Sequence, residues 1–210
     1  MRKVIISVIS TVVVIAAVIG GLVMYIRGTG FSAREQPTWM EKVMAQNARK
    51  IATPADAKSL KNPRQQQTED MIAEADEHFV EHCGMCHGID GRGDTLIGKN
   101  LYPKVPDMSA AADTQQLGDG ELYYIIYNGI RLTGMPAWGS EDKPEAIWDL
   151  VSLIRRLPKL SPEELQRLQK AARAAGGELA EQAGEPEKKE AAEPSKEGNA
   201  TPKHTHTHKH

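Results

Sequence analysis

The amino-acid sequence predicts an all-α protein with an N-terminal transmembrane helix and a disordered C-terminal tail. In the central part, apolar residues recur at helical spacing and never alternate as in a half-buried strand. The first 27 residues are almost entirely apolar, whereas Glu, Lys, Ala, Gly and Pro dominate after residue 176. We divide the chain into a transmembrane anchor at 1–27, a basic connector at 28–67, a globular domain at 68–158, an additional helix at 159–175 and a disordered, His-ended tail at 176–210.

The N-terminal apolar run covers residues 4–26, which carry no charge. About 20 apolar residues suffice to cross the ~30 Å hydrocarbon core of a bilayer. The alternative is a cleaved signal peptide, whose apolar region usually runs for about 7–15 residues and ends at a small-residue cleavage site. Because this run is longer and no A-x-A follows it closely, we expect a retained, single-pass membrane anchor.

Charge changes sign between the connector and the domain that follows it. Residues 27–67 hold eight basic and three acidic residues, a net charge of +5, whereas residues 68–158 hold 16 acidic and seven basic residues, a net charge of −9. Three interpretations of the connector remain open: a solvated tether, a segment lying on anionic headgroups, or one that wraps the acidic domain. The opposite charges favour wrapping at low salt. We expect no nucleic acid partner for an acidic domain.

Four helices are predicted after the connector, at residues 68–83, 121–127, 144–157 and 161–175. Thr68 and Ser161 suit N-cap positions, and Pro162 suits the first helical position. Residues 88–120 are rich in glycine and proline and show little periodicity. Something other than their own side chains must organise loops of this length.

The motif C-x-x-C-H occurs once, as Cys83-Gly84-Met85-Cys86-His87. Each cysteine sulfur can add to one haem vinyl group, and two intervening residues place the sulfurs at the separation of the two vinyls. The adjacent histidine then becomes an axial ligand of the iron. We therefore predict one haem c, covalently bound through Cys83 and Cys86 and ligated by His87. A backbone carbonyl near Pro103 is our predicted acceptor for the other ring nitrogen of this histidine.

Two other interpretations of the cysteine pair are less consistent with the sequence. A thioredoxin-like dithiol should follow a strand in a βαβ unit, whereas this motif ends an amphipathic helix in a chain without strand patterns. A zinc site needs about four Cys or His ligands. His78 and His82 are near in sequence, but on a helix we expect them to point away from the turn at Cys86 and His87.

A methionine is the predicted second axial ligand. Met135 lies between Gly134 and Pro136, residues that allow close approach and fix the following backbone, so this loop can hold a thioether in place. Met108, in Pro106-Asp107-Met108, is the competing candidate. We favour Met135 as the metal ligand opposite His87. A thioether ligand raises the reduction potential relative to a second histidine.

Together these features resemble the class I c-type cytochromes over residues 68–157. The resemblance rests on Phe79 four residues before the first cysteine, Cys83-x-x-Cys86-His87-Gly88, Asp90-Gly91-Arg92-Gly93-Asp94, Tyr102-Pro103-x-x-Pro106-Asp107, Gly134-Met135-Pro136-Ala137-Trp138-Gly139 and Ile147-Trp148-Asp149-Leu150-Val151. The C-x-x-C-H motif alone is moderately specific. Joined to the methionine loop at this spacing, it is a strong indication of the class I cytochrome c fold.

The resemblance implies further contacts. The first and last helices of such a domain cross near Phe79 and the face of Trp148. Trp138 and Arg131 are implied to contact the haem propionates. The sequence departs from the family at Leu153, where many relatives carry an aromatic residue in the last helix.

These observations predict a monohaem carrier of single electrons. Haem attachment outside the bacterial cytoplasm, as in the family, implies an anchor in the inner membrane and a haem domain in the periplasm. The expected partner is a redox protein or respiratory complex, and the acidic domain predicts a basic docking surface on it. The chain then acts as a shuttle or as a subunit of an oxidoreductase complex, not itself as an enzyme.

Two alternatives belong to other functional classes. An open or labile sixth position at the iron would give a haem-based peroxidase or gas-binding module. The histidines of the tail, His204, His206, His208 and His210, could instead make the chain a metal-binding accessory protein.

Overall fold

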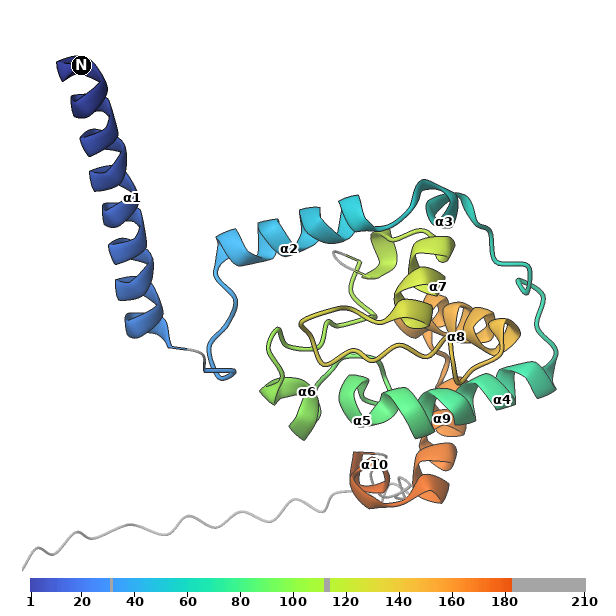
Figure 1. Cartoon of the computed structure of the whole chain (residues 1–210). Helices are drawn as coiled ribbons and strands as arrows, with labels where there is room; N and C mark the ends of the chain where they lie inside the picture. The colour runs from blue at the N-terminus through green and yellow to red at the C-terminus, as the bar shows by residue number, and fades with distance from the viewer. Residues whose placement is uncertain (31, 112–113, 183–210) are drawn as a thin grey trace, which may run out of the picture.

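The computed structural model describes residues 1–30, 32–111 and 114–182, and within these ranges every regular element is helical, as predicted (Figure 1). The elements are α1 (Arg2–Thr29), α2 (Trp39–Ala52), α3 (Ala55–Ser59), α4 (Glu69–His78), η1 (Phe79–Cys83), α5 (Gly84–His87), α6 (Leu96–Asn100), η2 (Thr114–Gln116), α7 (Asp119–Asn128), α8 (Pro144–Arg156), η3 (Leu157–Lys159), α9 (Pro162–Ala175) and α10 (Gly177–Gln182). Most of the predicted tail, including its four histidines, lies outside the described residues.

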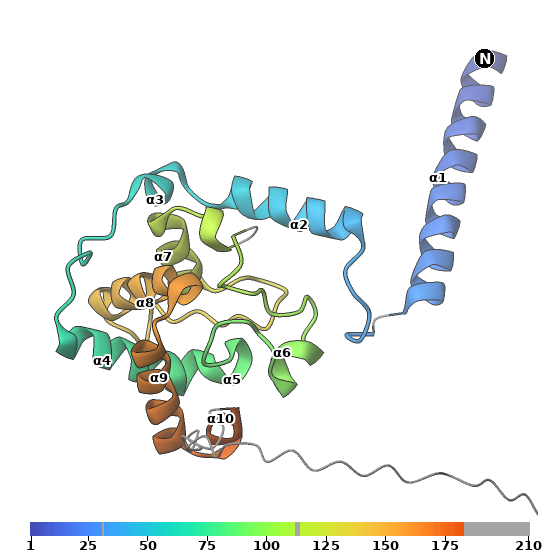
Figure 2. The same cartoon turned by 180° about the vertical axis from the view of Figure 1, so that it is seen from behind.

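Helix α1 is long and apolar enough to cross a membrane. Its 28 residues correspond to about 42 Å of helix, which exceeds the ~30 Å hydrocarbon core. None of its apolar span is buried against the rest of the chain, and both views show it standing clear of the other helices (Figures 1 and 2). An apolar helix whose span is not buried against the rest of the chain fits a lipid environment.

The connector has an exposed half and a docked half. Helix α2 begins with a capping box between Thr38 and Glu41 and buries none of its residues. After it, Thr53 and Ala57 are buried. The carbonyl oxygen of Ala57 approaches α7 so closely that a Cβ on Gly120 would lie 1.9 Å away. Glycine at this position therefore lets α3 pack on α7.

Residues 62–67 fasten the connector to α8. The Asn62 amide donates to the carbonyl of Trp148 at 3.1 Å, and Arg64 binds both carboxylate oxygens of the buried Asp149 at 2.8 and 2.9 Å. Gln67 donates to the same carboxylate at 3.0 Å. The connector wraps the acidic domain here, so the solvated-tether interpretation is wrong for residues 53–67.

The hydrophobic core lies between α4–η1, α7 and α8. Its most deeply buried side chains include Phe79 and Val80 from η1 and a row along one face of α8: Ile147, Leu150, Val151 and Leu153. The ring of Trp148 stacks on Tyr123 of α7 at 4.3 Å between centroids. Phe79 and Trp148 share this core, as the resemblance implied, and Leu153 is completely buried in it.

Helix α9 belongs to the same core, although the sequence suggested a separate addition. Leu168 and Ala172 are completely buried in the cluster that contains Phe79. The buried carboxylate of Asp76 on α4 pairs with Arg167 at 3.1 Å and with Arg156 at 3.4 Å. The predicted boundary at residue 158 therefore does not coincide with an edge of the core.

Candidate functional site

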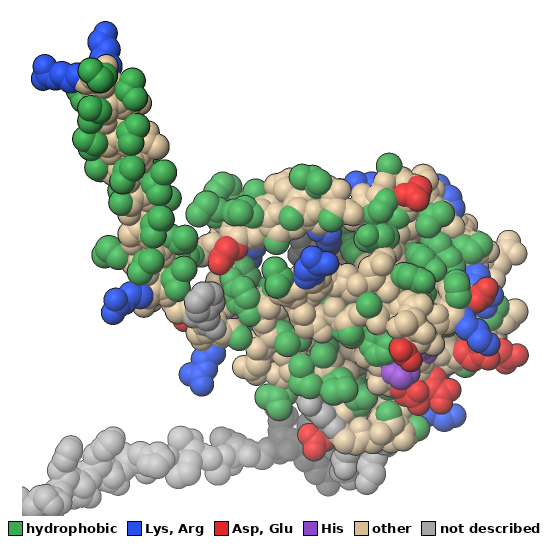
Figure 3. Space-filling view, in the orientation of Figure 1, with side chains coloured by type: hydrophobic (Ala, Val, Ile, Leu, Met, Phe, Trp, Pro, Cys, Tyr) green, Lys and Arg blue, Asp and Glu red, His purple; other side chains and the backbone are tan. Residues whose placement is uncertain are grey.

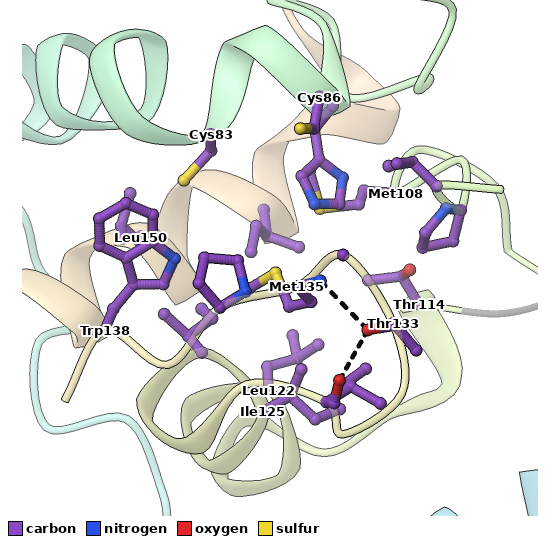
Figure 4. A pocket seen from close by; sticks show the side chains of 18 of the residues that line it. Cys83, Cys86, Met108, Thr114, Leu122, Ile125, Thr133, Met135, Trp138 and Leu150 are labelled. Carbon is purple, nitrogen blue, oxygen red and sulfur yellow. Dashed lines mark hydrogen bonds between the residues drawn. The ribbon is translucent and has the colours of Figure 1, made fainter. Parts of the chain in front are cut away.

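An apolar pocket opens between two segments that are distant in sequence (Figure 4). We call residues 79–98 the cysteine wall and residues 129–139 the methionine wall. Together with side chains of α7 and α8 they enclose about 1120 Å³ of space, counting the opening to solvent. An apolar pocket with a few polar groups among its lining residues is typical of a site for a small molecule or cofactor.

A π-helical turn shapes the cysteine wall. Residues Phe79–Cys83 form the π-helix η1, and the N–H of Gly84 donates to the carbonyl of Phe79. Such widened turns occur frequently at functional sites. Leu179 of α10 packs against the turn, because a Cβ on Gly84 would lie 3.1 Å from its side chain. The predicted helix at 68–83 is thus an α-helix followed by a π turn, and the short helix α5 follows directly after it.

The loop after α5 holds the C-x-x-C-H backbone. The N–H of Gly93 donates to the carbonyl of His87 at 2.7 Å, and the buried Thr95 hydroxyl donates to the carbonyl of Cys86 at 3.1 Å. Gly98 lies so close that a Cβ would stand 2.4 Å from the Cys86 carbonyl oxygen. The glycine-rich loop that showed no periodicity in sequence is therefore fastened to this motif.

Burial sets the protonation of the motif's side chains. It raises the pKa of the Cys83 thiol to about 12 and lowers the pKa of His87 to about 4. At neutral pH the imidazole is uncharged and can donate a nitrogen lone pair to a metal. The Nδ1 atom is buried and has no hydrogen-bond partner within the described residues, so the predicted acceptor near Pro103 is not observed.

Backbone contacts to the end of α7 hold the methionine wall. The N–H of Trp138 donates to the carbonyl of Ile126 at 3.1 Å, and the N–H of Gly139 donates to that of Tyr127 at 2.9 Å. Gly129 has a φ of 65°, and a Cβ there would lie 2.6 Å from the backbone of Pro136. Only glycine fits this position without displacing the loop.

Met135 is positioned by a threonine within the methionine wall. Its N–H donates to the Thr133 hydroxyl at 3.1 Å, and this hydroxyl donates to the carbonyl of Ile130 at 2.7 Å (Figure 4). The Met135 carbonyl accepts from the N–H of Ile130 at 3.2 Å. The side chain lines the pocket across from the segment that carries Cys83 and Cys86.

Met108, the competing methionine, also lines the pocket but is tied to the other wall. Its N–H donates to the carbonyl of Gly91, four residues after His87, at 2.8 Å. Its carbonyl accepts from the Gln115 amide at 2.7 Å. Of the two candidates, Met135 is the one whose loop faces the cysteine wall.

The remaining predicted residues divide into two groups. Trp138 lines the pocket, whereas Arg131 is exposed and is not among the lining residues. His82 also lines the pocket, with its ring 5.2 Å from that of Trp138, so the expectation that it points away is wrong. The widened turn of η1 explains this, because it breaks the helical spacing on which that expectation rested.

Two cationic residues that line the pocket were not predicted from the sequence. Arg49 comes from α2 in the connector and Lys104 from the loop after α6. The basic composition of the connector was the only signal, and it did not indicate which cation would reach the pocket.

Residues 70–154 match the family model described as cytochrome C oxidase, cbb3-type, subunit III. This segment is a c-type cytochrome domain. Members of this family bind haem c and carry electrons, and the matched range contains both walls of the pocket. The cytochrome domain follows an N-terminal helix that fits a membrane anchor.

The pocket of the cytochrome domain fits a haem. Its lining is mostly aliphatic and aromatic, as a porphyrin requires. The thiols of Cys83 and Cys86, the neutral imidazole of His87 and the thioether of Met135 are among the other groups that line it. Thiol groups suit vinyl addition, and the imidazole and thioether are a common axial pair in c-type cytochromes.

Proposed function

We propose that the protein is a membrane-tethered monohaem cytochrome that passes single electrons between membrane or periplasmic redox partners. When bound, the haem supplies the one-electron change at its iron. The observation that carries the proposal is the pairing of Cys83, Cys86 and His87 on one wall with Met135 on the other. This arrangement supports covalent attachment on one side and ligation from both sides.

The chain's own residues then serve to hold and shield the cofactor. Cys83 and Cys86 would hold it covalently, and the His87 imidazole and the Met135 thioether would ligate its iron. Iron ligated on both sides does not readily bind oxygen or peroxide, so the arrangement favours electron transfer over catalysis. Phe79, Leu150 and the other apolar lining side chains keep water from the cofactor.

The anchor and the attachment chemistry together suggest the location. We propose that α1 is retained in the bacterial inner membrane and that residues from 28 onward lie in the periplasm. The haem would then move close to the membrane surface, which suits a shuttle between respiratory complexes or a subunit of one. The description of the matched family, an oxidase subunit, supports the second arrangement.

An acidic face supports a partner with a basic docking surface. Helix α4 and η1 expose Glu69, Asp70, Glu74, Glu77 and Glu81. Acidic side chains gather over this region in the space-filling view (Figure 3). Charge steers the encounter of such partners, so the rate of electron transfer should fall as salt rises. A rate that is indifferent to ionic strength would contradict this part of the proposal.

The first experiment compares absorption spectra of the oxidised and reduced full-length protein with those of two matched variants. Met135→Leu and Met108→Leu both replace a pocket methionine by a residue of similar volume. We expect a c-type spectrum with a methionine–iron charge-transfer band in the wild type. The band should be absent in Met135→Leu and unchanged in Met108→Leu.

Three results would each contradict a part of the proposal. A high-spin wild-type spectrum would mean that the sixth position is open and would favour the peroxidase or gas-binding alternative. If Met108→Leu lost the methionine–iron band and Met135→Leu kept it, Met108 would be the methionine ligand in place of Met135. A potentiometric titration that departs from a single one-electron step would contradict the monohaem assignment.

A further inference from the structure

Two cationic side chains line the otherwise apolar pocket, Arg49 of α2 and Lys104 of the loop after α6. Neither takes part in an ion pair among residues 1–30, 32–111 and 114–182. Arg49 is half-buried, as is Val43, whereas the other residues of α2 are exposed. A guanidinium drawn toward an apolar cavity is costly without an anionic partner. A carboxylate in the pocket would give Arg49 such a partner.

The C-cap residue of α2 is buried, and the N-terminal part of the helix contacts the loop after α6. At its C-terminal end, the N–H and the hydroxyl of the buried Thr53 both donate to the Arg49 carbonyl at 2.9 Å. Near its N-terminal end, Glu41 hydrogen-bonds to Tyr102, which together with burial raises the pKa of that phenol. Figure 3 shows Lys and Arg side chains in the hollow beneath α2. Arg49 is thus about one helical turn from the buried Thr53 and lines the pocket.

We propose that Arg49 binds a haem propionate, so that the connector completes the haem pocket. This inference rests on the proposed function. A haem carries two propionate carboxylates, and a guanidinium pairs with a carboxylate through two parallel hydrogen bonds. Lys104 supplies a second cation at the same cavity. The exposed Arg131, which the resemblance implied for this role, lies outside the lining residues.

The reduction potential of the full-length protein tests the proposal. Reduction adds negative charge to the cofactor, so a cation beside it favours the reduced form. We expect Arg49→Gln to lower the equilibrium constant for reduction about tenfold, which is about 59 mV for one electron. Arg49→Lys keeps the positive charge, so its reduction potential should stay close to that of the wild type. Glutamine is a good helix former, so α2 should persist, which far-UV circular dichroism checks.

Lys50→Gln is the matched control, because it removes the same charge from the adjacent, exposed position outside the pocket. The effect of Lys50→Gln on the reduction potential should be small. It should vanish near 1 M salt, where the screening length is about 3 Å. The Arg49→Gln shift should persist there. Equal shifts in both variants, or a shift in Arg131→Gln instead, would overturn the inference. A wild-type protein without a c-type spectrum would instead contradict the proposed function itself.

Discussion

The two walls of the haem pocket are built in different ways. The cysteine wall is largely helical and is backed by further helices, through Leu179 of α10 against Gly84 and Leu168 of α9 in the core. The methionine wall is a loop held by backbone hydrogen bonds to α7 and by Thr133. At its tip, Leu132 is 92% exposed and has a φ of 64°. The proposed covalent attachment thus falls on the better supported wall, and the methionine wall should open at lower free-energy cost.

The largest expected effect is on the support of the cysteine wall. Leu168→Ala removes a completely buried side chain and should lower the free energy of unfolding by about 2–5 kcal/mol in denaturant titrations. Leu132→Ala, a control on the exposed tip of the methionine wall, should change it by less than about 0.5 kcal/mol. Similar losses in both variants would mean that α9 does not support the domain.

A second variant tests the crowding of the methionine wall. Gly129→Ala places a Cβ 2.6 Å from Pro136 in a backbone conformation that only glycine adopts easily, at a cost of about 1–3 kcal/mol. We expect the methionine–iron band to weaken along with stability. Gly176→Ala has a similarly positive φ but no neighbour within 4 Å, so it should leave the band unchanged. An intact band in both variants would show that the loop adjusts freely.

Matching threonines allow a direct comparison of the walls. Thr95→Val removes hydrogen bonds to Cys86 and Gly98, and Thr133→Val removes those to Ile130 and Met135. Each should cost about 1 kcal/mol. We expect Thr95→Val to lower the free energy of unfolding with the band intact. Thr133→Val should weaken the methionine–iron band. A band that is weakened in Thr95→Val and intact in Thr133→Val would contradict the comparison of the two walls.

The sequence was informative where the chemistry is local and less so where it depends on packing. The spacing of Cys83, Cys86 and His87 and the loop around Met135 are short-range patterns, so they predicted which residues line the pocket. The amphipathic face of α9 was visible, but periodicity does not reveal which helix such a face contacts. Arg49 reaches the pocket only because Thr53 and Ala57 fasten the connector to the domain, a contact with no short-range signature.

The smallest expected effect concerns pH and the cap of α9. The Ser161 N–H donates to the Glu164 carboxylate at 2.9 Å and, with Arg156, holds the pKa of Glu164 below its ordinary value of 4.5. A carboxyl with a lowered folded-state pKa adds stability that is present above 4.5 and is lost as pH falls through the folded pKa. For a charge at a helix N-terminus we expect about 0.3–1 kcal/mol.

Glu164→Gln should therefore remove this part of the acid sensitivity, measured as the difference in unfolding free energy between neutral pH and a pH below 4.5. Glu163→Gln changes the adjacent, exposed carboxyl and serves as the control. Because α9 carries Leu168 into the core, loss of the cap should loosen the cysteine wall before the methionine wall. Hydrogen exchange that instead rises first at residues 129–139 in acid would show that the two walls respond independently of α9.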